Sequence, residues 1–316
     1  MKPPVDYLFP PVDPDAVPYW RLVLRGCSQL CFQTNELTGL FFLAAILVAS
    51  PITAAYMLVA GIIAPGARML LGHRGAILST GLPGLNPSLI AISLPAFYET
   101  GWTNFGMWGV LLVCVVLTVV LVRVFLILLP FPILVLPFLL IFWGLWALEP
   151  YLDVLQPAAF SLNKTATFHP LGSIVTSLGE ALFSPTLLSG ILFFCGVLVS
   201  NVRHAIIALL GATIGSLVSY YYRDADPASV NIGLYGFNGV LAAVSAYVIC
   251  GGKLRLAILA ALVATILIPA IGSLGVQSLS APFALATWLL LILGWIDRRW
   301  FAVPAEDAAD PAKPDT

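Results

Sequence analysis

Apolar residues occupy most of this chain in long blocks that short polar intervals separate. A helix needs about 20 apolar residues to cross the hydrocarbon core of a bilayer. The blocks therefore predict an all-α polytopic membrane protein with two repeats, each of about five transmembrane helices. The predicted spans cover residues 39–50, 52–71, 81–97, 106–129, 131–148, 187–200, 205–222, 232–250, 254–271 and 281–296.

Two shorter stretches, 18–34 and 171–185, are less apolar and precede the spans of each half. The first carries Arg21 and Arg25 and is too short and too polar to cross a bilayer. We expect one short, half-membrane helix from each stretch.

The longest polar interval begins at Glu149, after which the pattern restarts. We therefore place the boundary between the two halves there. The predicted regions are an N-terminal tail over 1–17, a first repeat half over 18–148, a linker over 149–170, a second repeat half over 171–300 and a C-terminal tail over 301–316.

The two halves share sequence motifs in the same order. Residues 81–93 and 233–245 are identical at seven of thirteen positions, and Pro137-Phe138 before Trp143 echoes Pro282-Phe283 before Trp288. A repeat with an odd number of spans enters the membrane upside down relative to its copy. Inverted repeats place a solute site between interrupted helices, and the Gly/Pro-broken segments 81–87 and 233–239 mark that place.

Composition agrees with a bilayer and excludes some partners. The 316 residues are 60% hydrophobic and 9% charged, with a mean hydropathy of +1.01. A net charge of −1 provides no basic field for nucleic acid. Cys27 and Cys31 stand four apart, as a metal pair could, but no His or third Cys is near them. Apolar filler is the better interpretation, and we expect neither a metal nor a cofactor.

Candidate chemistry appears at one stretch in each half. Glu180-Ala181-Leu182-Phe183 echoes Gln29-Leu30-Cys31-Phe32, so a side chain with an acceptor oxygen precedes a Phe by three residues in both. A charge at membrane depth costs about 2.5–3.5 kcal/mol on insertion scales and tends to face a cavity. The alternative for Glu180 is an interfacial position in water. Shared acceptor oxygens suit a solute with N–H donors better than an ion.

Other polar residues leave two interpretations open. Asn86 and Asn238 could satisfy the broken backbone or contact a solute. Thr287 could bond to a carbonyl of its own helix or face the solute. No metalloprotease, nucleophile-elbow or phosphate-loop motif is present, and we expect no enzyme activity.

Over about residues 20–300, these motifs resemble the urea transporter family. The resemblance rests on Gly233-Leu234-Tyr235-Gly236-Phe237-Asn238-Gly239-Val240-Leu241, on Pro282 to Trp288, and on Gln29 to Gly39. It implies passive transport by a homotrimer in a multi-pass inner (plasma) membrane location, each protomer with its own channel between inverted halves.

The resemblance also assigns pore positions. It implies that Gln29 and Glu180 are the two solute acceptors. The positions that it implies for the walls of the filter are Phe32, Phe183, Phe237, Leu89, Leu241 and, at the centre, Thr287.

This chain departs from the family pattern in its first half. Leu85 stands where the family has Phe, Phe142 where it has Thr, and Pro87 where it has Gly. We expect a channel for urea or a related small neutral amide. The alternatives are an ammonia- or water-conducting pore of the same fold and, as a third, a membrane enzyme or non-transporting scaffold.

Overall fold

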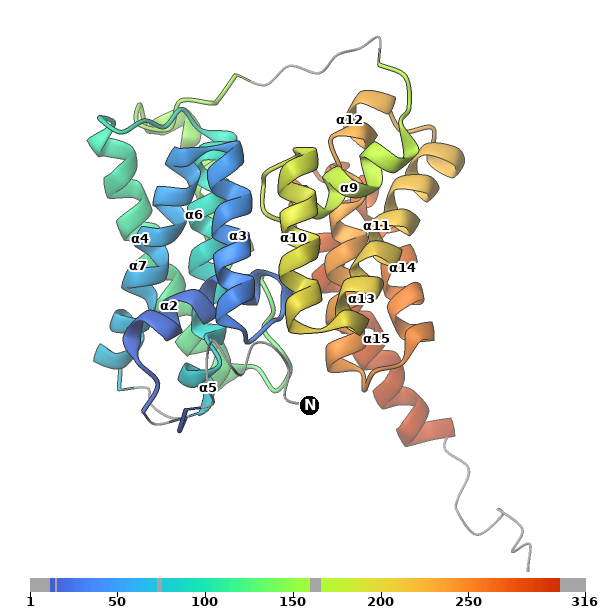
Figure 1. Ribbon diagram of the computed structural model, residues 1–316, viewed down its shortest axis with the longest axis horizontal. Coiled ribbons are helices and arrows are strands. Elements are labelled where there is room, and N and C mark those ends of the chain that lie inside the picture. The colour runs from blue at the N-terminus through green and yellow to red at the C-terminus, as the bar shows by residue number, and fades with distance from the viewer. Residues whose placement is uncertain (1–11, 15, 73–75, 160–165, 302–316) are drawn as a thin grey trace, which may run out of the picture.

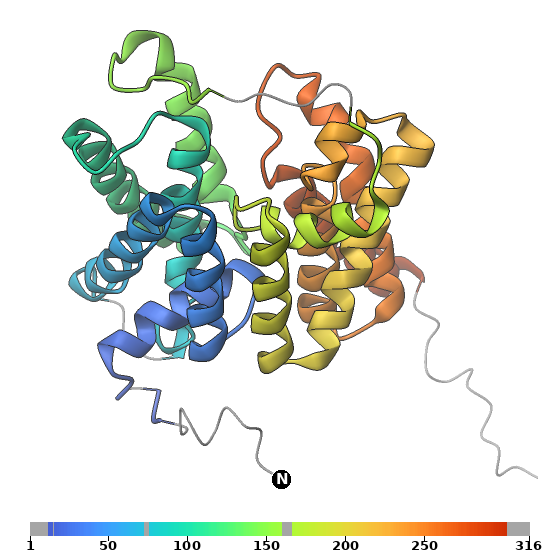
Figure 2. The same ribbon diagram turned by 45° about the horizontal axis from the view of Figure 1, so that its top comes forward.

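In the computed structural model, residues 12–14, 16–72, 76–159 and 166–301 are described, and every regular element among them is a helix. The helices form two groups, coloured blue to green and yellow to red (Figure 1, Figure 2). This arrangement confirms the prediction of an all-α polytopic membrane protein. The predicted C-terminal tail beyond Phe301, most of the N-terminal tail and residues 160–165 of the linker lie outside the described residues.

The helices of the first group follow the order expected for one repeat. They are α2 (Tyr19–Ser28), η1 (Gln29–Cys31), α3 (Glu36–Ala49), α4 (Pro51–Leu70), α5 (Ala76–Ser79), η2 (Leu82–Gly84), α6 (Leu85–Phe97), α7 (Phe105–Leu128), α8 (Leu136–Leu148) and η3 (Glu149–Tyr151).

The second group repeats this order, so that α9 corresponds to α2, α10 to α3, and so on to α15, which corresponds to α8. Its helices are α9 (Pro170–Glu180), α10 (Leu187–Ser200), α11 (Val202–Arg223), α12 (Pro227–Asn231), α13 (Phe237–Ile249), α14 (Leu254–Gly272), α15 (Ala281–Ile296) and the π-helical turn η4 (Asp297–Phe301).

The helices differ in length more than the apolar blocks predict. Five are long and apolar enough to cross a membrane, and a sixth span is possible if the pair Tyr19–Cys31 and Glu36–Ala49, bent by 71°, counts as one. Four further apolar helices, α6, α8, α10 and α13, have only 13 or 14 residues. At 1.5 Å per residue these cover about 20 Å of a core about 30 Å thick. They are interrupted helices, and the chain enters α6 and α13 through turns.

The two halves are inverted relative to each other, as contacts between α3 and α10 show. The Thr38 hydroxyl donates to the carbonyl oxygen of Gly196 over 2.7 Å, and the Ser189 hydroxyl donates to that of Ala45 over 2.7 Å. Each bond joins the start of one helix to the end of the other, so the two helices are antiparallel. They lie side by side where the two groups face each other (Figure 1).

Equivalent residues meet at the middle of this helix pair. The rings of Phe42 and Phe193, which are 151 positions apart in the sequence, stack with centroids 4.8 Å apart and an interplanar angle of 6°. Contact between a residue and its own counterpart marks an approximate two-fold axis. A second reciprocal pair obeys the same symmetry. The indole N–H of Trp143 donates to Gln277 O over 2.9 Å, and that of Trp288 donates to Pro132 O over 2.8 Å.

Glycine sets how closely the short helices α2 and α9 approach the helices that follow them. A Cβ on Gly39 would lie 2.1 Å from the carbonyl oxygen of Leu24, and one on Gly190 would lie 2.0 Å from that of Val175. Only glycine fits at these crossings. Because α2 and α9 lead directly into the turns at Gln29 and Glu180, the two glycines also fix the position of the candidate site.

We expect Gly39→Ala and Gly190→Ala to lower the free energy of unfolding by about 1–3 kcal/mol, since overpacking forces the backbones apart. Thermal melting in detergent measures this change. Gly144→Ala is the matched control, because nothing lies within 4 Å of a Cβ there and alanine favours the helix. Equal melting temperatures for all three variants would contradict the role of the crossings.

Candidate solute pathway

The two turns predicted to carry the chemistry are built alike. The backbone N–H of Phe32 donates to the carbonyl oxygen of Gln29, and that of Phe183 donates to the carbonyl oxygen of Glu180, each over 2.9 Å. Phe32 and Phe183 have φ angles of 57° and 52°. This left-handed conformation is rare for a bulky residue and costs about 1–3 kcal/mol. The same strained backbone at the same place in both repeats points to a function for these turns.

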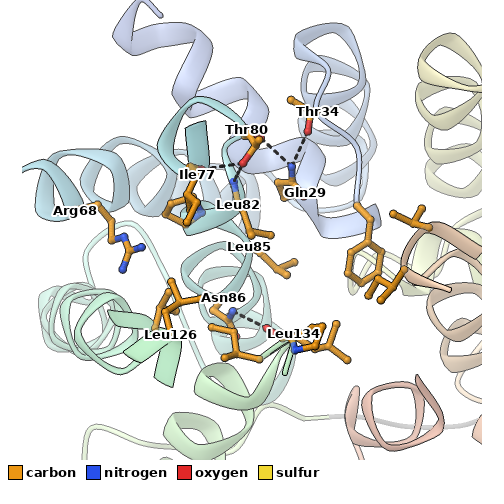
Figure 3. A pocket seen from close by; sticks show the side chains of 17 residues that line it. Gln29, Thr34, Arg68, Ile77, Thr80, Leu82, Leu85, Asn86, Leu126 and Leu134 are labelled. Atoms are coloured by element: carbon orange, nitrogen blue, oxygen red, sulfur yellow. Dashed lines mark hydrogen bonds between the residues drawn. The ribbon is translucent and has the colours of Figure 1, made fainter. Parts of the chain in front are cut away.

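Gln29 has a defined amide orientation and is only 5% exposed. Its Nε2 donates to the carbonyl oxygen of Thr80 over 2.8 Å and to Thr34 Oγ1 over 3.0 Å (Figure 3). A carbonyl oxygen can only accept, so the NH₂ group must face Thr80. The amide oxygen Oε1 is left as an acceptor without a protein donor among the described residues.

Glu180 ends α9, and its side chain is 8% exposed. No hydrogen bond or ion pair to its carboxyl group is formed by the described part of the chain. Burial of an unpaired carboxylate is unfavourable by several kcal/mol. The side chain is therefore available to a ligand that brings its own donors.

Asn86 and Asn238 close the breaks that precede α8 and α15. Asn86 donates to Leu134 O over 2.9 Å and accepts from Phe138 N over 3.0 Å. Asn238 repeats this with Leu279 O at 2.9 Å and Phe283 N at 3.2 Å. Both ends of each amide are occupied by backbone, which favours the structural interpretation of these residues over solute contact.

One cavity brings together several of the predicted residues of the first half. It has a volume of about 380 Å³ and mostly apolar walls, and Gln29, Phe32 and Leu85 line it (Figure 3). Val248 and Ile249 at the end of α13 also line it, so the cavity lies between the two halves.

Phe183 lies in an aromatic cluster with residues of the opposite half. Its ring packs edge-to-face against Phe97 with centroids 6.1 Å apart, and Phe97 packs edge-to-face against Phe142 with centroids 4.9 Å apart. Phe97 was not among the predicted site residues. Its counterpart by the repeat offset is Ile249, which shares the cavity wall with Phe32. No local sequence signal marks Phe97, because its contact with Phe183 depends on how the two halves approach each other.

The predicted central residues are fully buried. The Thr287 hydroxyl lies 2.7 Å from Ser245 Oγ and 2.9 Å from the carbonyl oxygen of Phe283 in its own helix. This hydroxyl therefore has one partner in its own helix and one on α13. The ring centroid of Phe142 lies 6.1 Å from that of Phe138 and 6.3 Å from that of Tyr98. The remaining predicted wall residues, all buried in the same core, are Leu89, Phe237 and Leu241.

A second buried acid was missed by the sequence analysis. Glu36, at the start of α3, accepts from Arg21 Nε over 2.6 Å and from Arg25 Nε over 2.8 Å. The two arginines are one helical turn apart on α2, so both reach the same carboxylate. Arg25 Nη1 also donates to Ser79 O over 2.6 Å. The spacing of Arg21 and Arg25 was the available signal.

Sequence comparison decides the family. Residues 20–294 match the model of the family described as "UT: Urea transporter". The chain belongs to the urea transporter family. "Urea transporter 1" of Rattus norvegicus is 25% identical over 256 residues, covering 73% of this chain and 64% of that protein. "Urea transporter 1" of Ovis aries is 24% identical over 330 residues, covering 94% of this chain and 83% of that protein.

The family match extends over both repeats and includes both turns. Identity with these urea transporters is low, and the matched region spans just under two thirds of the rat protein. Membership therefore confirms the resemblance of the motifs, whereas the roles of single residues rest on the geometry of this chain.

Proposed function

We propose that this chain is a passive channel for urea. The observation that carries the proposal is the pair of turns at Gln29–Phe32 and Glu180–Phe183, which present an unused acceptor oxygen beside a strained phenylalanine on each inverted half. Their inverted arrangement suits a solute that passes from one acceptor to the other.

The physical chemistry of urea matches these groups. Urea is neutral and planar, and its N–H donors must exchange water for new acceptors before it enters an apolar passage. An unmet donor costs several kcal/mol in an apolar medium, whereas a replaced hydrogen bond is close to neutral. Gln29 Oε1 and the Glu180 carboxylate provide that replacement. Hydrated ions lose much more on dehydration and are excluded by apolar and aromatic walls.

In the proposed pathway, the walls combine aromatic and aliphatic side chains from both halves. Leu85 and Phe142 make the first half different from the second, which carries Phe237 and Thr287 at those positions. Phe97 joins the wall beside Phe183 because it packs against both Phe183 and Phe142. The proposed pore residues are Gln29, Phe32, Leu85, Leu89, Phe97, Phe142, Glu180, Phe183, Phe237, Leu241 and Thr287.

The proposed assembly is a homotrimer in the inner (plasma) membrane. Each copy keeps its own pathway, because the acceptors and walls come from the two halves of a single chain. Flux through such a pathway follows the urea gradient and requires no energy source, cofactor or catalytic step.

The test of this function is urea influx into proteoliposomes, measured by stopped-flow light scattering. We expect influx well above that of empty liposomes and independent of proton and sodium gradients. Influx equal to that of empty liposomes would overturn the proposal. Water or ammonia permeation without urea influx would identify a different pore of the same fold.

Glu180→Ala should reduce urea influx about tenfold or more, since loss of an acceptor in a dry passage removes at least 1.4 kcal/mol of stabilisation. Glu180→Gln keeps an acceptor oxygen and should retain most of the influx. A normal elution volume on a sizing column controls for folding. Unchanged influx in Glu180→Ala would show that this carboxylate is not in the pathway.

Phe142→Thr and Leu85→Phe restore the second-half residue types in the first half. We expect the Phe142→Thr change to raise urea influx relative to that of larger amides, because it widens the centre and adds a hydroxyl. Leu85→Phe should favour flat solutes over branched ones. A solute panel in the same liposomes measures both effects, and identical selectivity in all variants would remove these positions from the filter.

A further inference from the structure

Arg68 on α4 is the largest fully buried side chain in the described chain, with an exposed fraction of 0%. None of its nitrogens Nε, Nη1 and Nη2 has a hydrogen-bond partner among the described residues. A guanidinium stays charged at any physiological pH and carries five N–H donors. Such a group buried without a partner is strongly unfavourable, so its position calls for an acceptor from outside the chain.

The surrounding chain supplies no acid for this arginine. The sequence has no Asp or Glu over 37–98 or over 100–148, a range that includes all of α4 and α7. The buried Glu36 is already paired with Arg21 and Arg25. Among the described residues, Arg68 is therefore a cation that no carboxylate pairs with.

A second cation adds to the positive field. Arg123 on α7 lies at the same end of α4 as Arg68, because its Nη1 donates to the carbonyl oxygen of Leu71, just beyond the end of α4. That bond holds Arg123 beside α4. The positive charges of Arg68 and Arg123, which no described carboxylate neutralises, attract an anion.

Arg68 forms part of the wall of the cavity that Gln29 and Phe32 line, and its guanidinium is directed toward the space beside Ile77 and Leu126 (Figure 3). Ile77 and Leu126 are themselves surface-exposed, so they can change rotamer to admit a group to the arginine. Most of the other residues that line the cavity are apolar, among them Leu82 and Val122.

We propose that Arg68 binds an oxyanion, a phosphate or carboxylate group, at the edge of this cavity. The planar guanidinium suits two oxygens of such a group at once. The anion is either the headgroup of an anionic lipid, whose chains would cover the apolar wall, or a free soluble oxyanion. A group held there narrows the approach to Gln29, a consequence that rests on the proposed function.

The test measures binding without urea, so its failure is distinct from failure of the proposed function. The protein is stripped of lipid in neutral detergent and melted with phosphatidylglycerol, with phosphatidylcholine, with sodium phosphate, and with sodium chloride at matched ionic strength. We expect phosphatidylglycerol to raise the melting temperature by about 5 °C relative to phosphatidylcholine, or sodium phosphate to do so relative to sodium chloride. A shift with phosphatidylglycerol identifies a lipid headgroup, and a shift with phosphate identifies a free oxyanion.

Arg68→Met should abolish this shift and should melt at or above the wild-type temperature without ligand, because it removes a buried unpaired charge. Arg203→Met is the matched control, since it removes one exposed arginine on α11 and should keep the shift. Arg68→Gln serves the same purpose if Arg68→Met does not fold. No shift in the wild type, or the same shift in the Arg68 variants, would overturn the proposal.

Discussion

Helices broken inside a bilayer need an internal partner for every backbone group that the break exposes, and this constraint governs the structure. Water is not available there, so each unmet N–H or C=O costs several kcal/mol. Asn86 and Asn238 meet the constraint by binding both a carbonyl oxygen and an N–H at the breaks before α8 and α15. The asparagine amide suits this role because its NH₂ group donates while its oxygen accepts, on one short side chain.

The same constraint explains which parts of the repeat stay symmetric. The Asn clamps, the glycine crossings at Gly39 and Gly190, and the reciprocal Thr38 and Ser189 bonds all involve backbone, and both halves keep them. Side chains that face space rather than backbone diverge instead. Leu85, which lines the cavity, differs from its counterpart Phe237. Paired side chains can diverge as well, since the cluster of Arg21, Arg25 and Glu36 exists in the first half alone among the described residues.

The pattern of apolar blocks and the internal repeat could predict the helix order and the turns, because these features depend on residues close together in the sequence. The offset of about 150 residues pairs Gln29 with Glu180 from the sequence alone. It could not predict Phe97 against Phe183 or Glu36 against Arg21, since those contacts depend on how close two helices approach. The spans predicted over 81–97 and 232–250 are shorter as helices, because the glycines and prolines that mark the breaks do not show how many residues each turn occupies before α6 and α13 begin.

The difference between Gln29 and Glu180 follows from their neighbours. The Gln29 amide uses its NH₂ group to hold Thr80 O and Thr34 Oγ1, which leaves one oxygen outward. The counterpart of Thr34 is Pro185, which has no hydroxyl group. An ionised carboxylate has no donor, so in that form Glu180 cannot make the bonds that the Gln29 amide makes. Gln29 and Glu180 therefore each keep an acceptor oxygen that the protein leaves unused. In the proposed pathway the two halves share this oxygen, whereas the charge of Glu180 has no counterpart at Gln29.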